Sequence, residues 1–253
     1  DNPPGPPVRV AECENQRAEA AFVANEIRRH VAQGGRFCDV AIFYRVNALS
    51  RNLEAAMRDA RVPYQIARGV AFYQRKEIKD VLAYLKVTAN PRDQVSLLRI
   101  INVPTRGIGK TTVDHLVAES RRRNQGVLEM FADLDKLPGV SRAARHLKSF
   151  SSLMADLAIT ARTGRVQDAV EFVVRNAGLI AMWSGAEDDD ALANVEELVN
   201  AAAEYDRQHL DGSGSLTDWL QQISLISDVD AFDPEAGSVR LMTMHAAKGL
   251  EFN

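Results

Sequence analysis

Val239-Arg-Leu-Met-Thr-Met-His-Ala-Ala-Lys-Gly-Leu-Glu-Phe-Asn253 is the stretch of sequence that decides the fold. Its first five residues form an apolar run, interrupted by one arginine, that predicts a short strand. Open α/β sheets bind ligands where a strand ends in a polar loop. We therefore expect a ligand site that begins in the loop after this strand and is not completed within the chain. The loop carries Thr243, His245, Lys248, Gly249 and Glu251.

The first 89 residues alternate between strand and helix patterns. The run Asp39-Val-Ala-Ile-Phe-Tyr44 is apolar almost throughout, which is typical of a parallel strand buried on both faces. Such an alternation predicts an α/β fold with a parallel sheet. The predicted strands are 8–12, 39–44 and 63–66, and the predicted helices are 16–33, 50–61 and 76–88.

Helical periodicity dominates from about residue 90 to residue 227. An acidic stretch with Pro and Gly follows at 228–237, and the strand pattern then resumes at Val239. The simplest organisation is a helical domain inserted into an α/β domain. We expect 1–89 and 238–253 to form the α/β part, and 90–237 to form the helical insertion. The predicted helices of the insertion are 111–124, 127–134, 141–160, 166–176, 190–208 and 216–226.

Composition and charge limit the class of protein. The 253 residues are 46% hydrophobic, which is enough for one large domain or two modest ones. There is no run of 18 apolar residues, so no membrane span is expected. Residues 1–150 carry 25 Lys and Arg against 16 Asp and Glu, a balance of +9, and residues 151–253 carry 6 against 18, a balance of −12. The basic part suggests a nucleic acid or nucleotide partner, although a solvated surface explains the charge equally well.

The N-terminus and the cysteines indicate the compartment. Asp1-Asn-Pro-Pro-Gly-Pro-Pro7 contains no apolar segment, so we interpret it as a linker left by truncation and not as a signal peptide. Cys13 and Cys38 lack metal-ligand spacing, and two such thiols are typical of a cytosolic protein. We therefore expect a cytoplasmic protein. We also expect no metal site of its own, because His245 belongs to no His/Cys cluster.

The residues after the buried strand at 39–44 are a candidate nucleotide site. Tyr44 and Arg45 stand at the predicted carboxyl end of that strand, immediately before a helix. An aromatic ring can stack on a base there, and a guanidinium can pair with phosphate. The alternative is that Tyr44 packs in the core and Arg45 forms a surface ion pair.

A second candidate lies in Pro104-Thr-Arg-Gly-Ile-Gly-Lys-Thr-Thr112. Its Gly-Lys-Thr resembles a phosphate-binding P-loop, which requires a glycine five residues before the Gly-Lys pair. Pro104 occupies that position and provides no N–H, so an ATP site is disfavoured. The Gly107-Ile-Gly109 turn before a helix can instead present backbone N–H groups to a nucleic-acid phosphate, with Arg106 and Lys110 beside it. A purely structural tight turn explains the same pattern.

Taken in order, these segments resemble the UvrD/PcrA/Rep group of superfamily 1 DNA helicases. The resemblance spans nearly the whole chain, and the set of motifs is highly specific although no single one would suffice. It implies a partial RecA-like domain, called 2A, interrupted by the mostly helical 2B subdomain. Residues 41–51 resemble helicase motif IV, 69–85 the segment after it, 102–109 the Gly-Ile-Gly element of 2B, and 241–252 motif V.

The resemblance implies a role for each candidate residue. Tyr44 would stack on adenine, and Arg45 would reach the γ-phosphate as a catalytic arginine finger. Glu251 would bind the ribose hydroxyls, with Gly249 in the same nucleotide-binding loop. The residues implied in DNA binding are Thr243 and His245 on single-stranded DNA, and Arg106, Gly107, Gly109, Lys110 and Thr111 at the duplex.

The function implied is that of an ATP-dependent DNA helicase translocating 3′ to 5′, of which this chain is a fragment. The Walker A loop and the acidic metal box are absent, so ATP with Mg²⁺ would be held mostly by the first RecA-like domain of the same parent chain. We expect this fragment alone not to hydrolyse ATP. Two alternatives remain, a non-enzymatic helicase-derived interaction or DNA-binding module, and a stand-alone P-loop NTPase that uses Lys110.

Overall fold

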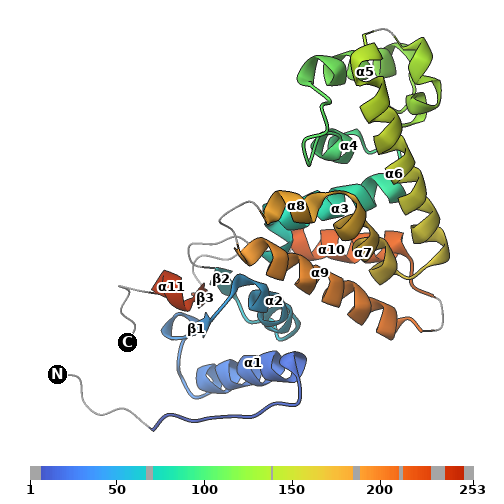
Figure 1. The fold of residues 1–253 in the computed structure, drawn as a ribbon. Coiled ribbons are helices and arrows are strands. Elements are labelled where there is room, and N and C mark those ends of the chain that lie inside the picture. Colours follow the sequence, from blue (N-terminus) through green and yellow to red (C-terminus); the bar gives the residue numbers. More distant parts are fainter. Residues whose placement is uncertain are drawn as a thin grey trace. The chain divides into compact units, whose positions relative to one another are not determined.

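The computed structural model describes residues 7–66, 71–137, 139–184, 189–210, 213–228 and 237–247. The chain divides into two compact units. Unit 1 comprises Asp1–Ala71 with Phe232–Asn253, and unit 2 comprises Phe72–Ala231 (Figure 1).

Unit 1 contains a three-stranded parallel sheet in the order β1-β3-β2. The strands are β1 (Ala41–Tyr44), β2 (Tyr64–Ile66) and β3 (Val239–Thr243). The central strand, β3, pairs Tyr44 with Thr243 on one side and Tyr64 with Val239 on the other. The prediction that both ends of the chain share one parallel sheet is therefore confirmed.

Two helices, α1 (Gln16–Ala32) and α2 (Ser50–Asp59), build the core of unit 1 with the sheet. Ile27 of α1, Met57 of α2 and Leu241 of β3 are each at most 3% exposed and belong to one cluster. Asn15 begins α1, since its Oδ1 accepts a hydrogen bond from the N–H of Ala18 at 2.9 Å. The short helices of this unit are η1 (Phe37–Asp39), η2 (Asn47–Leu49) and α11 (Met244–Ala247).

One expected strand of unit 1 does not form. Residues 8–12 have no regular secondary structure, and the side chains of Val8 and Val10 are 93% and 95% exposed. A strand needs a neighbour for its backbone N–H and C=O groups, and the sheet of β1, β3 and β2 does not include this segment. The prediction of a strand at 8–12 was therefore wrong.

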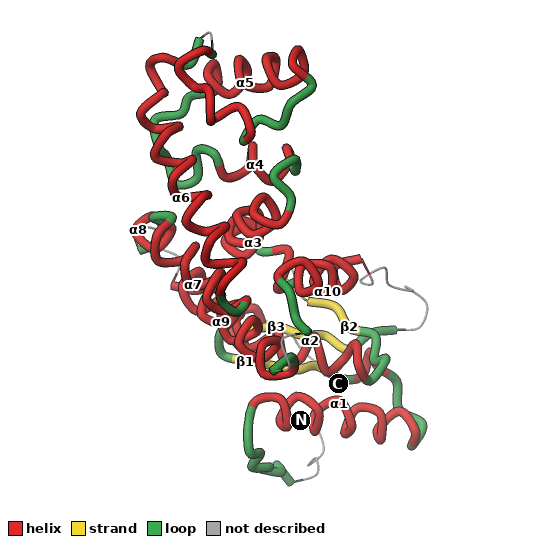
Figure 2. The backbone as a smooth tube through the Cα atoms, turned by 90° about the vertical axis from the view of Figure 1, so that its right-hand side faces the viewer, coloured by secondary structure: helices red, strands yellow, loops and turns green. Residues whose placement is uncertain are grey.

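Unit 2 is helical and packs around α3 (Lys76–Ala89). Helix α3 contacts α4, α6, α7, α9 and α10, and its Ile78, Val81 and Leu85 are fully buried. Figure 2 shows the helical character of this unit in red. Its α-helices also include α4 (Gln94–Ile100), α5 (Lys110–Arg123), α6 (Ala144–Thr163), α7 (Val166–Asn176), α8 (Leu179–Trp183), α9 (Asp189–Gln208) and α10 (Leu216–Asp228). The short helix η3 (Phe72–Gln74) precedes α3, and η4 (Glu129–Lys136) and η5 (Ser141–Ala143) lie between α5 and α6.

The domain boundary predicted from the sequence and the boundary in the structure lie on opposite sides of α3. The sequence grouped residues up to 89 with the sheet, whereas α3 belongs to the helical unit in the structure. The reason is that α3 is buried on nearly all sides by other helices of unit 2. The assignment of 1–89 with 238–253 to 2A, and of 90–237 to 2B, stays a proposal.

Candidate functional site

The carboxyl ends of β1 and β3 bring two sequence motifs together in unit 1. Tyr44, the last residue of β1, is the register partner of Thr243, the last residue of β3. Since the strands are parallel, the segments that follow them leave the sheet at the same edge. This edge is where ligands bind in open α/β sheets.

Tyr44 and Arg45 have opposite environments at this edge. Tyr44 is only 6% exposed and belongs to the core cluster that contains Met57 and Leu241. Arg45 is exposed, in the turn between β1 and η2. The side chain available to a ligand in this conformation is therefore the guanidinium, while the tyrosine ring packs in the core.

The first turn of α2 contains a buried pair that the sequence did not single out. The Ser50 hydroxyl donates a hydrogen bond of 2.6 Å to Glu54 Oε1, and the two residues are 0% and 2% exposed. Their spacing of four residues on one helix was the signal that could have revealed this pair. The pair lies at the start of α2, five residues after Arg45.

Thr243 and His245 lie at the end of β3, where the chain enters α11. The Thr243 hydroxyl accepts a hydrogen bond of 3.2 Å from the N–H of Ala246, so this threonine caps the short helix. His245 is exposed. The predicted nucleotide-binding residues Gly249 and Glu251, and Lys248 between them and α11, lie outside the described residues.

The Gly107–Gly109 turn of unit 2 is organised by one amide side chain. Asn102 Oδ1 accepts hydrogen bonds from the N–H groups of Arg106 at 2.7 Å and Ile108 at 3.3 Å. Ile108 is 1% exposed and anchors the turn in the core. Gly107 has φ of +75°, a conformation that favours glycine. The turn is therefore rigidly placed before α5.

Arg106 points into unit 2. Its Nη1 donates to the carbonyl oxygens of Ile100 and Pro104, both at 3.1 Å. Its Nη2 donates to Tyr84 Oη at 2.5 Å and to the carbonyl oxygen of Ala177 at 2.8 Å. A guanidinium has five N–H donors, so four are used inside the protein. The guanidinium is therefore engaged within unit 2 in this conformation, and the expected DNA contact of Arg106 stays a prediction.

Lys110 and Thr111 begin α5 and are exposed. Gly109 is the N-cap and has no side chain to bond the first turn. The first hydrogen bond of the helix runs from the N–H of Val113 to the carbonyl oxygen of Gly109. The N–H groups of residues 110–112 therefore come before the first helical hydrogen bond. These amides and the ammonium group of Lys110 form the part of the turn that is suited to an anion.

The structure also bears on the P-loop interpretation of this turn. A P-loop lies between a strand and a helix. Here helix α4 precedes the turn, and Pro104 occupies the position of the first glycine. The architecture that would let Lys110 reach a nucleotide β- or γ-phosphate is missing, so a stand-alone P-loop NTPase is disfavoured.

One further basic residue lies close to the turn. His146 of α6 lies close to Gly107, since a Cβ added at Gly107 would be 3.1 Å from the imidazole Nε2.

At the other end of α5, Glu119 accepts hydrogen bonds from Arg122 and Arg123, which lower the pKa of Glu119 to about 2. The charge of this arginine run is thus partly neutralised. Arg142 of η5 and Arg145 and Lys148 of α6 are also exposed.

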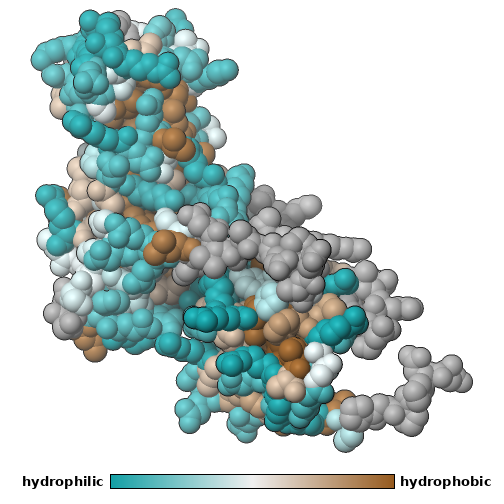
Figure 3. Space-filling view, turned by 180° about the vertical axis from the view of Figure 1, so that it is seen from behind, coloured by the Kyte–Doolittle hydropathy of each residue, from teal (hydrophilic) through white to brown (hydrophobic). Residues whose placement is uncertain are grey.

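The remaining surfaces of the described chain carry no comparable chemistry. Among the described residues, no group of His, Cys, Asp or Glu could hold a metal ion, and no helix could span a membrane. The face seen in Figure 3 is largely hydrophilic, with hydrophobic residues in separate areas.

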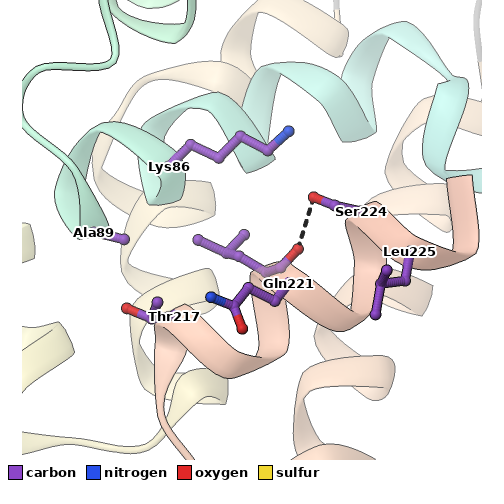
Figure 4. Close-up of a pocket in the computed structure, with 7 residues that line it drawn as sticks. Lys86, Ala89, Thr217, Gln221, Ser224 and Leu225 are labelled. Carbon is purple, nitrogen blue, oxygen red and sulfur yellow. Dashed lines mark hydrogen bonds between the residues drawn. The ribbon is translucent and has the colours of Figure 1, made fainter. Parts of the chain in front are cut away.

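A groove of about 380 Å³ lies between α3 and α10 in unit 2 (Figure 4). Its lining contains no carboxylate, imidazole or thiol, so we assign it no acid–base chemistry. The Ser224 hydroxyl at its wall donates to the carbonyl oxygen of Leu220 at 2.9 Å. The groove is lined by Lys86, Ala89, Thr217, Leu220, Gln221, Ser224 and Leu225.

The parallel sheet, its interrupting helical unit and the Gly-Ile-Gly turn agree with the helicase domain that the sequence resemblance implies. Residues 2–253 match the UvrD-like helicase C-terminal domain, and the chain belongs to this family. The chain is 34% identical over 254 residues to the ATP-dependent DNA helicase PcrA of Staphylococcus epidermidis (strain RP62A), and also to that of Staphylococcus aureus (strain Mu50). Each alignment covers 99% of this chain and 35% of the relative, so the chain spans about a third of the length of these relatives.

Proposed function

We propose that this chain supplies one side of the ATP site and the DNA-contacting elements of an ATP-dependent helicase that translocates 3′ to 5′. The observation that carries the proposal is the pairing of Tyr44 with Thr243, because it aligns motifs IV and V at one edge of a single sheet. Membership of the UvrD-like family supports the same function, and the PcrA relatives are named as ATP-dependent DNA helicases.

On the nucleotide side, Arg45 is the residue best placed to act. Its exposure leaves the guanidinium able to stabilise the charge that develops on the γ-phosphate during hydrolysis. Tyr44 is buried, so stacking on adenine requires its ring to gain exposure when the nucleotide binds. Glu251 and Gly249 complete the proposed nucleotide contacts. Mg²⁺ would arrive with ATP on the first RecA-like domain and neutralise phosphate charge there.

On the DNA side, the two proposed contact regions lie in different units. His245 and Thr243 would contact the single-stranded backbone, and the Thr243 hydroxyl can do so only while sharing its oxygen with the cap of α11. Gly107, Gly109, Lys110 and Thr111 would contact duplex phosphate through N–H groups and the ammonium of Lys110. Both sets of contacts are independent of base sequence.

The decisive test uses the full-length protein that contains this chain. Arg45→Ala should lower the kcat of DNA-stimulated ATP hydrolysis by on the order of 10³-fold while ATP affinity changes little. The matched control is Arg28→Ala, which removes an exposed arginine of α1 in the same unit and should leave kcat unchanged. The 253-residue chain alone should show no ATP turnover.

Two results would contradict the proposal. An unchanged kcat for Arg45→Ala would remove the arginine-finger role. ATP-saturable turnover by the isolated chain would contradict the half-site interpretation. If the full-length protein binds DNA but shows no DNA-stimulated ATP hydrolysis, the non-enzymatic DNA-binding module becomes the better description of its function.

A further inference from the structure

The guanidinium of Arg106 is held by residues of four helices of unit 2, α3, α4, α6 and α7, as well as by its own turn. Tyr84 of α3 and Phe150 of α6 place their rings 5.7 and 5.4 Å from the guanidinium carbon, measured to the ring centroids. The carbonyl oxygen of Ala177, the C-cap residue of α7, accepts a hydrogen bond at 2.8 Å. These contacts tie the residue before Gly107 to the most buried part of the helical unit.

Tyr84 transmits this anchoring to the beginning of the turn. It is 0% exposed, and its hydroxyl donates to the carbonyl oxygen of Val103 at 2.6 Å while accepting from Arg106. Burial raises the pKa of the Tyr84 phenol to about 12, so the hydroxyl keeps the proton that it donates. One buried phenol thus fixes two points of the segment that precedes α5.

The turn leaves little slack between this anchor and α5. The N–H groups of Arg106 and Ile108 both donate to Asn102 Oδ1, and Ile108 is buried. Lys110, the first residue of α5, follows two positions later. A shift of the guanidinium therefore moves the first-turn amides and the Lys110 side chain with it.

We propose that Arg106 is a positioning residue that sets the orientation of the Gly107–Gly109 turn toward duplex DNA without touching the DNA, and that the buried Tyr84 is its partner. This inference rests on the proposed function, in which the turn contacts duplex phosphate. It assigns to Arg106 a role different from the phosphate contact that its charge and sequence position suggest.

The two roles predict different behaviour in salt. A side chain that neutralises a phosphate contributes about 0.9 to the slope of log affinity against log salt concentration. Loss of such a contact lowers the slope. A substitution at a buried residue that displaces the whole turn weakens binding but removes no charge, so the slope stays the same. Lysine at position 106 retains the charge but cannot make the four hydrogen bonds.

The experiment measures the affinity of the 253-residue chain for a fluorescent DNA duplex by anisotropy at several KCl concentrations. Tyr84→Phe and Arg106→Gln should each weaken binding about three- to tenfold with an unchanged salt slope, whereas a phosphate contact by Arg106 predicts a slope lower by about 0.9 in Arg106→Gln. Arg106→Lys should weaken binding to a similar degree. Lys110→Gln should lower the slope by about 0.9. The double variant of Tyr84 and Arg106 should bind little worse than Arg106→Lys alone, because both changes break the same contact.

Two controls separate positioning from general loss of stability. Leu198→Ala removes a fully buried side chain of α9 in the same unit and should lower the melting temperature without changing duplex affinity. Amide hydrogen exchange of Arg106 and Ile108, whose N–H groups donate to Asn102, should accelerate in Tyr84→Phe while the exchange of α9 stays the same. Both measurements are made well below the melting temperature of every variant.

The outcomes distinguish this inference from the proposed function. If Lys110→Gln lowers the slope but Tyr84→Phe and Arg106→Lys bind like the unaltered chain, positioning by Arg106 is refuted and the duplex contact stands. A loss of affinity in Leu198→Ala as large as that in Tyr84→Phe also refutes it. Absence of duplex binding by the unaltered chain overturns the duplex contact and the inference together.

Discussion

Asp206 of α9 should contribute measurably to the stability of unit 2, because it caps a different helix. Its two carboxylate oxygens accept hydrogen bonds from the N–H groups of Val166 at 3.0 Å and Gln167 at 2.8 Å, at the start of α7. Each helix cap of this kind is worth about 1 kcal/mol. Asp206→Ala leaves both N–H groups without this partner, so we expect the free energy of unfolding to fall by about 2 kcal/mol.

Urea denaturation followed by tryptophan fluorescence tests this prediction on the correct unit. The two tryptophans of the chain, Trp183 and Trp219, are 7% and 3% exposed and both lie in unit 2. With a urea slope of about 2 kcal/mol per molar, the midpoint should fall by about 1 M at an unchanged slope. The matched control is Asp156→Ala, an exposed acid in the middle of α6, which should change stability by less than about 0.5 kcal/mol. A midpoint shift in Asp206→Ala no larger than that of the control would refute the reasoning.

Two further predictions concern the ends of α5. Gly107→Ala should destabilise unit 2 by about 1 kcal/mol or more in urea denaturation, because Gly107 has φ of +75° and the new methyl would crowd His146. Gly109→Ala meets open space, so it should cost only the preference for glycine over alanine at an N-cap, about 0.5 kcal/mol. The hydrogen bonds from the two arginines lower the pKa of Glu119 to about 2 in the folded chain, from an ordinary value of 4.5. Glu119 therefore stabilises the fold fully at a pH above its unfolded pKa, and this stabilisation is lost as the pH falls toward the folded pKa. Glu119→Gln should therefore flatten the fall of the melting temperature between about pH 5 and about pH 3, and an unaltered fall would contradict the pairing with the two arginines.

The sheet was predictable from the sequence because its strands are apolar and strongly patterned. The runs at 39–44 and 239–243 are typical of buried parallel strands, and they pair directly in the structure. The segment at 8–12 has a similar local composition but no neighbour in the sheet. A local sequence pattern shows that a segment is suited to form a strand, and the tertiary fold determines whether that segment has a partner strand.

The short helices α4 and α8 were not predicted from the sequence for a related reason. Helix α4 has only seven residues, about two turns, which is too few for its helical period to be recognised in the sequence. Its cap was the available signal, since Asp93 Oδ1 accepts from the N–H of Ser96 at 3.0 Å. Helix α8, with five residues, gave still less periodicity.

The candidate residues show the limit of reasoning from residue type alone. Arg106 and Lys110 are both cations beside a glycine turn, yet one is turned into the core and the other is exposed. Tyr44 carries a ring suited to stacking, but the helices α1 and α2 build a core in which it is buried. The direction of a side chain depends on the partners that the fold supplies, which here are the Tyr84 hydroxyl and the Ala177 carbonyl for Arg106.

The central position of β3 has a consequence for the order in which the chain folds. Strands β1 and β2 are made early, but neither pairs with the other, and both must wait for Val239–Thr243. The helical unit is continuous in sequence from Phe72 to Ala231 and has its own core, so it can fold during synthesis before that strand emerges from the ribosome. Closing the sheet then means joining segments nearly two hundred residues apart, as the register of Tyr44 with Thr243 records. Unit 1 should therefore be the last part of the chain to become native.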